Sequence, residues 1–227
     1  MNEHKAAPEF IPLTFGVEAL YPPMAMMGGQ VRQVYMRLAD PCRFNEFRQL
    51  GEGQGARMAE GTNRYLTLAT DRLIYRDDMT RATFSGFCED FHIIFNTLRE
   101  QLRIPVLLHT KVLLRTLMPH NGSMKTNECI EKLLQPSTGE QIRRFQRPTS
   151  GVGFRFVFPP TNEHHSTFNV RIEPYYRDMK LFFLENSAQF FDPVIDYTLL
   201  EGYFHNAYTF LQNEAGAYIL SLTANQE

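Results

Sequence analysis

The sequence has no tryptophan and only three cysteines among its 227 residues. Cys42, Cys88 and Cys129 are far apart, odd in number and never in a CxxC spacing. This pattern argues against a disulfide framework and against a thiolate zinc site. We therefore predict a protein of the reducing cytoplasm that needs no metal and no cofactor.

The sequence also lacks a charge excess and a long apolar run. Lysine and arginine number 23 against 25 acidic residues, a net charge of −2. There is thus no global basic field to attract nucleic acid or anionic lipid, and such binding would have to be local. The N-terminal segment has no signal-peptide core, and no apolar run reaches the roughly 18 residues of a membrane span. We expect no membrane partner.

Phenylalanine and tyrosine are abundant, with 19 and 10 copies, and hydrophobic residues make up 43% of the chain. This composition is typical of a globular protein and not of a disordered one. A chain of this length buries roughly 70 to 75% of its unfolded surface, in one large domain or two small ones. The core is predicted to be built on phenylalanine.

Hydrophobic periodicity predicts a similar order of elements in both halves of the chain. The first half is predicted to contain a strand at 31–39, a short helix at 41–50, a glycine-rich loop, strands at 64–70 and 72–78, a helix at 83–103 and a strand at 104–118. The second half is predicted to contain strands at 151–160, 168–176 and 180–190, a helix at 193–216 and a strand at 217–223.

The two long predicted helices agree residue by residue. A shift of 205 − 92 = 113 places Phe91 and His92 on Phe204 and His205. This agreement favours a duplication, although two amphipathic helices also share a period by necessity. We predict an α+β fold of two related β-β-β-α-β units around a pseudo-twofold axis, each an antiparallel sheet covered by one long helix, with joining of the two sheets into one as the alternative. The predicted divisions are an N-terminal extension with a first strand (1–30), the first unit (31–121), a helical linker (122–150) and the second unit (151–227).

The 83–103 helix raises the question of whether Cys88 and His92 form a catalytic dyad. At about 100° per residue, Cys88 falls inside the apolar stripe that includes Phe87 and Phe91, whereas His92 lies at its flank. Burial would raise the pKa of the thiol and keep it inert, so we predict a structural role for Cys88. The matched histidines His92 and His205, with Asn206, remain candidates for ligand binding.

The basic cluster IRRFQR interleaves Phe145 with Arg143, Arg144 and Arg147. Arginines beside an aromatic ring can hold phosphates and stack on bases. Three arginines neutralise only a few phosphates, and a solvated linker face is the alternative interpretation. The sequence has no nucleophile motif and no pair of carboxylates at a helical spacing that would suit acid–base catalysis.

The segment YPPMAMMGG contains Met24, Met26 and Met27. Methionine side chains are flexible and polarizable and suit an adaptable partner surface. The alternative is that these methionines simply plug one end of the sheet.

The C-terminal segment LLEGYFHNAYTFLQNEAGAYILSLT resembles a sporadically distributed family of uncharacterised prokaryotic proteins, in which a late helix with a His-Asn pair leads into a closing strand. His205 and Asn206 match that pair, and the 10–21 segment is similar to the family's opening strand. The middle strand departs from the family pattern, because it has Leu114 and Arg115 but no tyrosine. The resemblance implies an accessory or defence-related role and identifies no catalytic residues.

Three functional hypotheses follow from these observations. The first is a non-catalytic cytoplasmic binding or assembly protein that holds a protein partner or a second copy of itself. The second is nucleic-acid binding through the 143–147 cluster. The third is an enzyme with a cleft between the two units that uses His92, His120 or His205.

Overall fold

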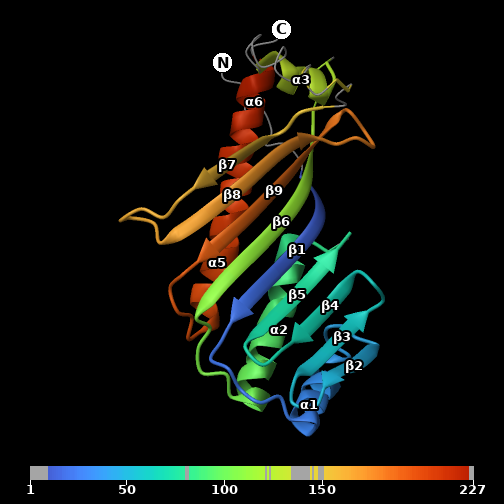
Figure 1. Ribbon diagram of the computed structural model, residues 1–227, viewed down its shortest axis with the longest axis vertical. Helices are drawn as coiled ribbons and strands as arrows, with labels where there is room; N and C mark the ends of the chain where they lie inside the picture. Colours follow the sequence, from blue (N-terminus) through green and yellow to red (C-terminus); the bar gives the residue numbers. More distant parts are fainter. Residues whose placement is uncertain are drawn as a thin grey trace.

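The chain forms one continuous antiparallel sheet, shown in Figure 1. The structure is a computed structural model that describes residues 10–79, 82–120, 122, 124–133, 144, 146–147 and 151–224. Within these residues the sheet has nine strands in the order β2-β3-β4-β5-β1-β6-β9-β8-β7. Its strands are β1 (Ile11–Leu20), β2 (Glu46–Gly51), β3 (Gly55–Glu60), β4 (Arg64–Leu68), β5 (Arg72–Asp78), β6 (His109–Pro119), β7 (Phe154–Phe158), β8 (Ser166–Pro174) and β9 (Leu181–Phe190).

Helices connect and cover these strands on one side. They are α1 (Gly28–Leu38), α2 (Phe84–Leu102), α3 (Thr126–Leu133), α5 (Tyr197–Thr209) and α6 (Gly216–Ala224), with a π-helical segment η1 (Phe210–Ala215) between the last two. Figure 1 shows α2 and α5 behind the sheet, on the same side of it. Phe15 of β1 contacts Phe84 and Phe87 of α2, so this side holds the hydrophobic core.

The prediction of two units with separate sheets is wrong, although the fold is α+β as expected. Strand β1, which was assigned to an N-terminal extension, pairs with β5 on one side and with β6 on the other. Strand β6 in turn pairs with β9 along ten residues. Alternation within a strand shows that it is half-buried but does not specify its neighbours. The central pairing therefore could not be predicted from local pattern.

Three local predictions are also corrected. Residues 31–39 belong to helix α1, because Val31, Val34 and Leu38 recur at helical spacing and are buried. Residues 41–50 form a turn and then β2. Residues 217–223 continue the C-terminal helix as α6. Gly216 does not end this helix, and a Cβ atom there would lie 2.9 Å from the Phe10 ring.

The glycine-rich segment is the turn of the β2–β3 hairpin and its flanks. Gly53 and Gly55 have φ values of +68° and +116°, which favour glycine because it has no Cβ atom. At Gly55 a Cβ atom would lie only 1.9 Å from the Leu68 carbonyl oxygen. The absence of a side chain at Gly55 therefore allows β3 to lie close to β4.

Candidate binding surface

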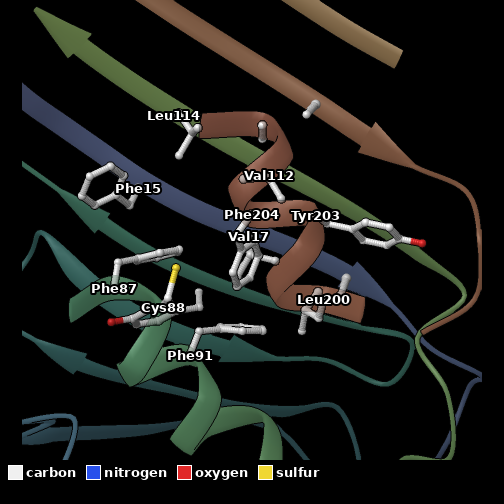
Figure 2. Close-up of a cluster of buried hydrophobic side chains, with 14 of the residues drawn as sticks. Phe15, Val17, Phe87, Cys88, Phe91, Val112, Leu114, Leu200, Tyr203 and Phe204 are labelled. Atoms are coloured by element: carbon white, nitrogen blue, oxygen red, sulfur yellow. The ribbon is translucent and has the colours of Figure 1, made fainter. Parts of the chain in front are cut away.

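Helices α2 and α5 pack antiparallel and bring the two halves of the core together. The rings of Phe91 and Phe204 meet edge to face with their centroids 5.4 Å apart, and the ring centroid of Phe87 lies 5.8 Å from that of Phe204. Figure 2 shows Phe87 and Phe91 of α2 near Phe204 of α5, with Val17 of β1 and Val112 of β6 close to Phe204. Of the pairs that the 113-residue shift superimposes, Phe91 and Phe204 meet across this contact.

His92 and His205 lie at different ends of the α2–α5 contact and form no common site. His92 stacks on Tyr197 with ring centroids 4.1 Å apart, and the Tyr197 hydroxyl donates to the carbonyl of Cys88. The Nδ1 atom of His205 lies 3.1 Å from the Glu201 carbonyl oxygen, and its ring contacts Phe84 edge to face. Asn206 is exposed beside it. Both imidazoles contact the helix pair itself.

His120 lies elsewhere, at the end of β6. Its Nε2 atom is 3.5 Å from the Cys129 sulfur of α3. Burial lowers the pKa of His120 and raises the pKa of Cys129, so both groups are held neutral. A neutral thiol beside a neutral imidazole is not an activated nucleophile. The three histidines of the enzyme hypothesis therefore do not line one cleft.

The prediction that Cys88 is a core thiol is confirmed. The residue is 5% exposed, and Figure 2 shows its sulfur directed into the aromatic cluster. Burial raises its pKa to about 12, with Glu201 and Glu89 adding to the effect. Cys42 is fully buried and its pKa is likewise raised to about 12, mainly by burial.

We expect all three cysteines of the native protein to resist a thiol reagent such as DTNB at about pH 8. Each is buried, and burial raises the pKa of each thiol, so that both reagent access and thiolate formation are reduced. After denaturation in guanidinium chloride, all three should react rapidly. The measurement is the absorbance of released thionitrobenzoate. Rapid labelling of one cysteine in the native protein would contradict this prediction.

The other predicted sites are only partly described. Arg143 and Phe145 lie outside the described residues, and Arg144 and Arg147 are exposed. Among the methionines, Met26 is fully buried and Met24 packs against the core, whereas Met27 is 61% exposed beside α1. The three methionines therefore do not form one common surface.

The sheet has a second face, which we call the open face. Its side chains alternate with those of the core, so that Gly16 of β1 follows Phe15 and lies between Arg76 of β5 and Leu113 of β6. No helix in the described ranges covers this face. Figure 1 views the molecule from this side.

The open face carries more basic than acidic side chains, although the whole chain is slightly acidic. By strand register, its basic residues are Arg48, Arg57, Arg72, Arg76, Lys111, Arg115, Arg155 and Arg171. Its acidic residues are Glu18, Glu46, Asp78, Glu173 and Glu185. Eight minus five is a net charge of +3 on this face, against −2 for the whole chain.

Two pairs of arginines lie directly opposite each other on neighbouring strands of the open face. Arg48 faces Arg57 across β2 and β3, and Arg155 faces Arg171 across β7 and β8. Like charges directly opposite each other in an antiparallel pair destabilise a sheet. The Arg57 guanidinium lies 4.0 Å over the Tyr65 ring, and among the described residues no acidic side chain pairs with Arg48, Arg57 or Arg155. In the second pair, Arg155 donates to Asn169 at 3.0 Å and Arg171 binds Glu173 and Glu185. The Arg48–Arg57 pair is therefore the like-charge contact that no described carboxylate offsets.

Arg115 and Arg171, the latter a member of the second pair, are held in place by carboxylates. Glu185 is only 8% exposed, and its two oxygens accept from Arg115 at 2.6 Å and from Arg171 at 3.5 Å. Arg171 also donates to Glu173 at 2.7 Å. The hydrogen bond to Glu173 is the main reason that the pKa of Arg171 is raised. The two guanidinium groups are therefore fixed in orientation next to each other.

These residues border a pocket of about 320 Å³ on the open face, at the end of the β8–β9 hairpin. Its walls include three arginines, two carboxylates and three aromatic rings, which belong to Arg115, Arg171, Arg177, Glu173, Glu185, Tyr175, Tyr176 and Phe183. Tyr176 is 56% exposed, so its ring is accessible. The pocket thus combines cationic groups with aromatic faces.

Sequence reasoning did not identify this surface. The basic residues are spread over separate strands and gather only when the sheet forms, so no run of the sequence contains them. A usable signal was present in the strands themselves, since Arg57, Arg76, Arg115, Arg155 and Arg171 all occupy alternate positions between core residues.

Comparisons with known proteins identify no family: no protein-family model and no curated protein matches this chain. In the described ranges, no helix has both the length and the apolar character needed to cross a lipid bilayer. Among the same residues, no three or more His, Cys, Asp or Glu side chains are grouped so that they could hold a metal ion.

Proposed function

We propose that the protein is a non-catalytic binding protein that holds nucleic acid on the open face of its sheet. The observation that carries this proposal is the cross-strand Arg48–Arg57 pair, which has no acidic partner among the described residues. The second pair, Arg155–Arg171, adds a further basic site, although Glu173 and Glu185 already bind Arg171. Violations of a local stability rule are expected at functional sites. A phosphate between two facing arginines would turn a repulsive contact into an attractive one.

The spacing of the pairs favours a polymeric anion over a small one. Strands β3 and β8 are six positions apart in the sheet order. At about 4.8 Å per strand, the nearest members of the two pairs, Arg57 and Arg171, are separated by about 29 Å across the sheet. A single small anion cannot contact both, whereas a nucleic acid carries phosphates over the whole distance. Arginine also suits phosphate because its planar group donates two parallel hydrogen bonds.

The slightly acidic net charge of the chain does not oppose this proposal. Electrostatic attraction acts over about one Debye length, roughly 10 Å in 0.1 M salt. A phosphate at the open face is therefore affected more by the net charge of that face than by the charges on the helical side of the sheet. The earlier hypotheses of a protein partner, of self-association and of a cytoplasmic accessory role stay predictions.

The proposal predicts measurable, salt-dependent binding of a fluorescein-labelled oligonucleotide of mixed sequence at about 50 mM salt. The double variant Arg57→Glu plus Arg155→Glu should bind at least about tenfold more weakly. The slope of log affinity against log salt should fall by about two, one for each lost phosphate contact. Fluorescence anisotropy measures both quantities.

The same variant is a sharp test because it should not harm folding. Each glutamate would face an arginine and replace a like-charge pair with an opposite-charge pair, which stabilises a sheet. The matched control is Arg32→Glu plus Arg99→Glu, which makes the same charge change on helices α1 and α2. Equal weakening by both variants, or no binding by the wild-type protein, would contradict the proposal.

A further inference from the structure

The pocket beside the β8–β9 hairpin differs from the rest of the open face, because it is concave and has aromatic walls. Arg115 and Arg171 line it, and the buried carboxylate of Glu185 holds both guanidinium groups. A preorganised pair of arginines loses little side-chain freedom when it binds a phosphate.

The aromatic walls add a second kind of recognition. Tyr175, Tyr176 and Phe183 line the same pocket, and Tyr176 has the most exposed ring of the three. Aromatic rings bind nucleobases by stacking, which requires a base whose face is free. The bases of a duplex are stacked on one another and do not offer their faces.

The pocket volume suits one base with its phosphate. About 320 Å³ lies at the lower end of the range for small-molecule sites. An α-helix or a duplex could not enter a space of this size. The pocket is also continuous with the open face, because Arg115 and Arg171 belong to both.

On the basis of the function proposed above, we infer that the pocket of Arg115, Arg171, Tyr175, Tyr176 and Phe183 accepts one unstacked base and its phosphate, so that the protein selects single-stranded over duplex nucleic acid. The shared chemistry is a planar base next to a phosphate. A free nucleotide offers the same groups, and the experiment separates it from a strand.

The probe is an oligothymidylate of about 12 nucleotides, within the site size of single-strand binders, with one internal 2-aminopurine. We expect it to bind at least about fivefold more tightly than a duplex of the same length, since stacking on one base is worth about 1–3 kcal/mol, or roughly 5- to 150-fold. Binding should quench 2-aminopurine fluorescence. Mixed nucleoside monophosphates at about tenfold excess over the strand should not displace it, because they lack the contacts along the face.

Tyr176→Ala should lose at least about fivefold in affinity for the strand, together with the quenching. Tyr176→Phe should keep both, because it retains the ring. Phe191→Ala removes a similarly exposed ring, 48% exposed at the end of β9 and outside the pocket, and should change neither.

The outcomes separate this inference from the proposed function. If Tyr176→Ala binds the strand normally while Arg57→Glu plus Arg155→Glu does not, the pocket inference is wrong and the open-face proposal stands. Equal affinity for strand and duplex, or displacement by the free nucleotides, would also overturn the inference. If the wild-type protein binds neither strand nor duplex, both are wrong.

Discussion

Replacing Phe204 with alanine is expected to lower the free energy of unfolding by about 3–5 kcal/mol. Phe204 is fully buried and contacts Phe87 and Phe91 of α2. Figure 2 shows it between that helix and the central strands of the sheet. Loss of the ring would remove its transfer free energy and leave a cavity that neither the sheet nor the second helix can fill.

Urea unfolding followed by circular dichroism measures this effect, with the midpoint lowered and the m-value unchanged. Asn206→Ala is the matched control, because Asn206 is exposed on the same helix two residues away. That variant should stay within about 0.5 kcal/mol of the wild type. A loss below about 1.5 kcal/mol for Phe204→Ala would contradict the central position of this ring.

A second large effect is expected at the buried charges between β4, β5 and α2. Replacing Asp90 with alanine should cost about 3–5 kcal/mol, because it leaves the Arg64 guanidinium buried without its nearest carboxylate. The Arg64 side chain is 5% exposed and pairs with Asp90. It also donates to the Tyr75 hydroxyl at 3.0 and 3.1 Å. The next acid, Glu60, is 3.4 Å away and much more exposed.

Arg64 cannot escape this cost by losing its proton. Burial by itself would lower the pKa of Arg64, but Tyr75, Asp90 and Asp77 raise it further than burial lowers it. The guanidinium therefore stays charged at every working pH. The pKa of Asp90 is raised by burial, against the opposing effect of Arg64.

Thermal and urea unfolding would test whether the cost of Asp90→Ala comes from the unpaired charge of Arg64. Two further variants serve as comparisons. Glu89→Ala changes the neighbouring acid on the exposed side of α2 and should stay within about 0.5 kcal/mol of the wild type. Arg64→Met plus Asp90→Ala removes both charges and should be more stable than Asp90→Ala alone. If the double variant is the less stable of the two, the cost does not come from an unpaired charge.

The sequence by itself determined the elements with a strong period and the character of the core. Helix α2 spans Phe84–Leu102, close to its prediction, because the apolar stripe is long and the Thr83 hydroxyl caps its first turn by accepting from the Gly86 amide at 3.1 Å. The burial of Cys88 followed from the same stripe. Strands β4, β5, β8 and β9 were predicted because each alternates between buried and exposed positions around a tight turn.

Only the tertiary structure decided how these strands combine. The pairing of β1 with both β5 and β6 joins residues about 60 and 100 positions apart in the chain, and no local period records such a choice. Strand pairing also creates the proposed binding surface, because Arg48 and Arg57, or Arg155 and Arg171, become neighbours only when their strands are in register. The 113-residue shift superimposes Phe91 on Phe204, and these two rings meet between the long helices. The sheet that the helices cover is nevertheless a single one. Local sequence specifies which side of a strand is buried, whereas the charge of the opposite side is a property of the assembled sheet.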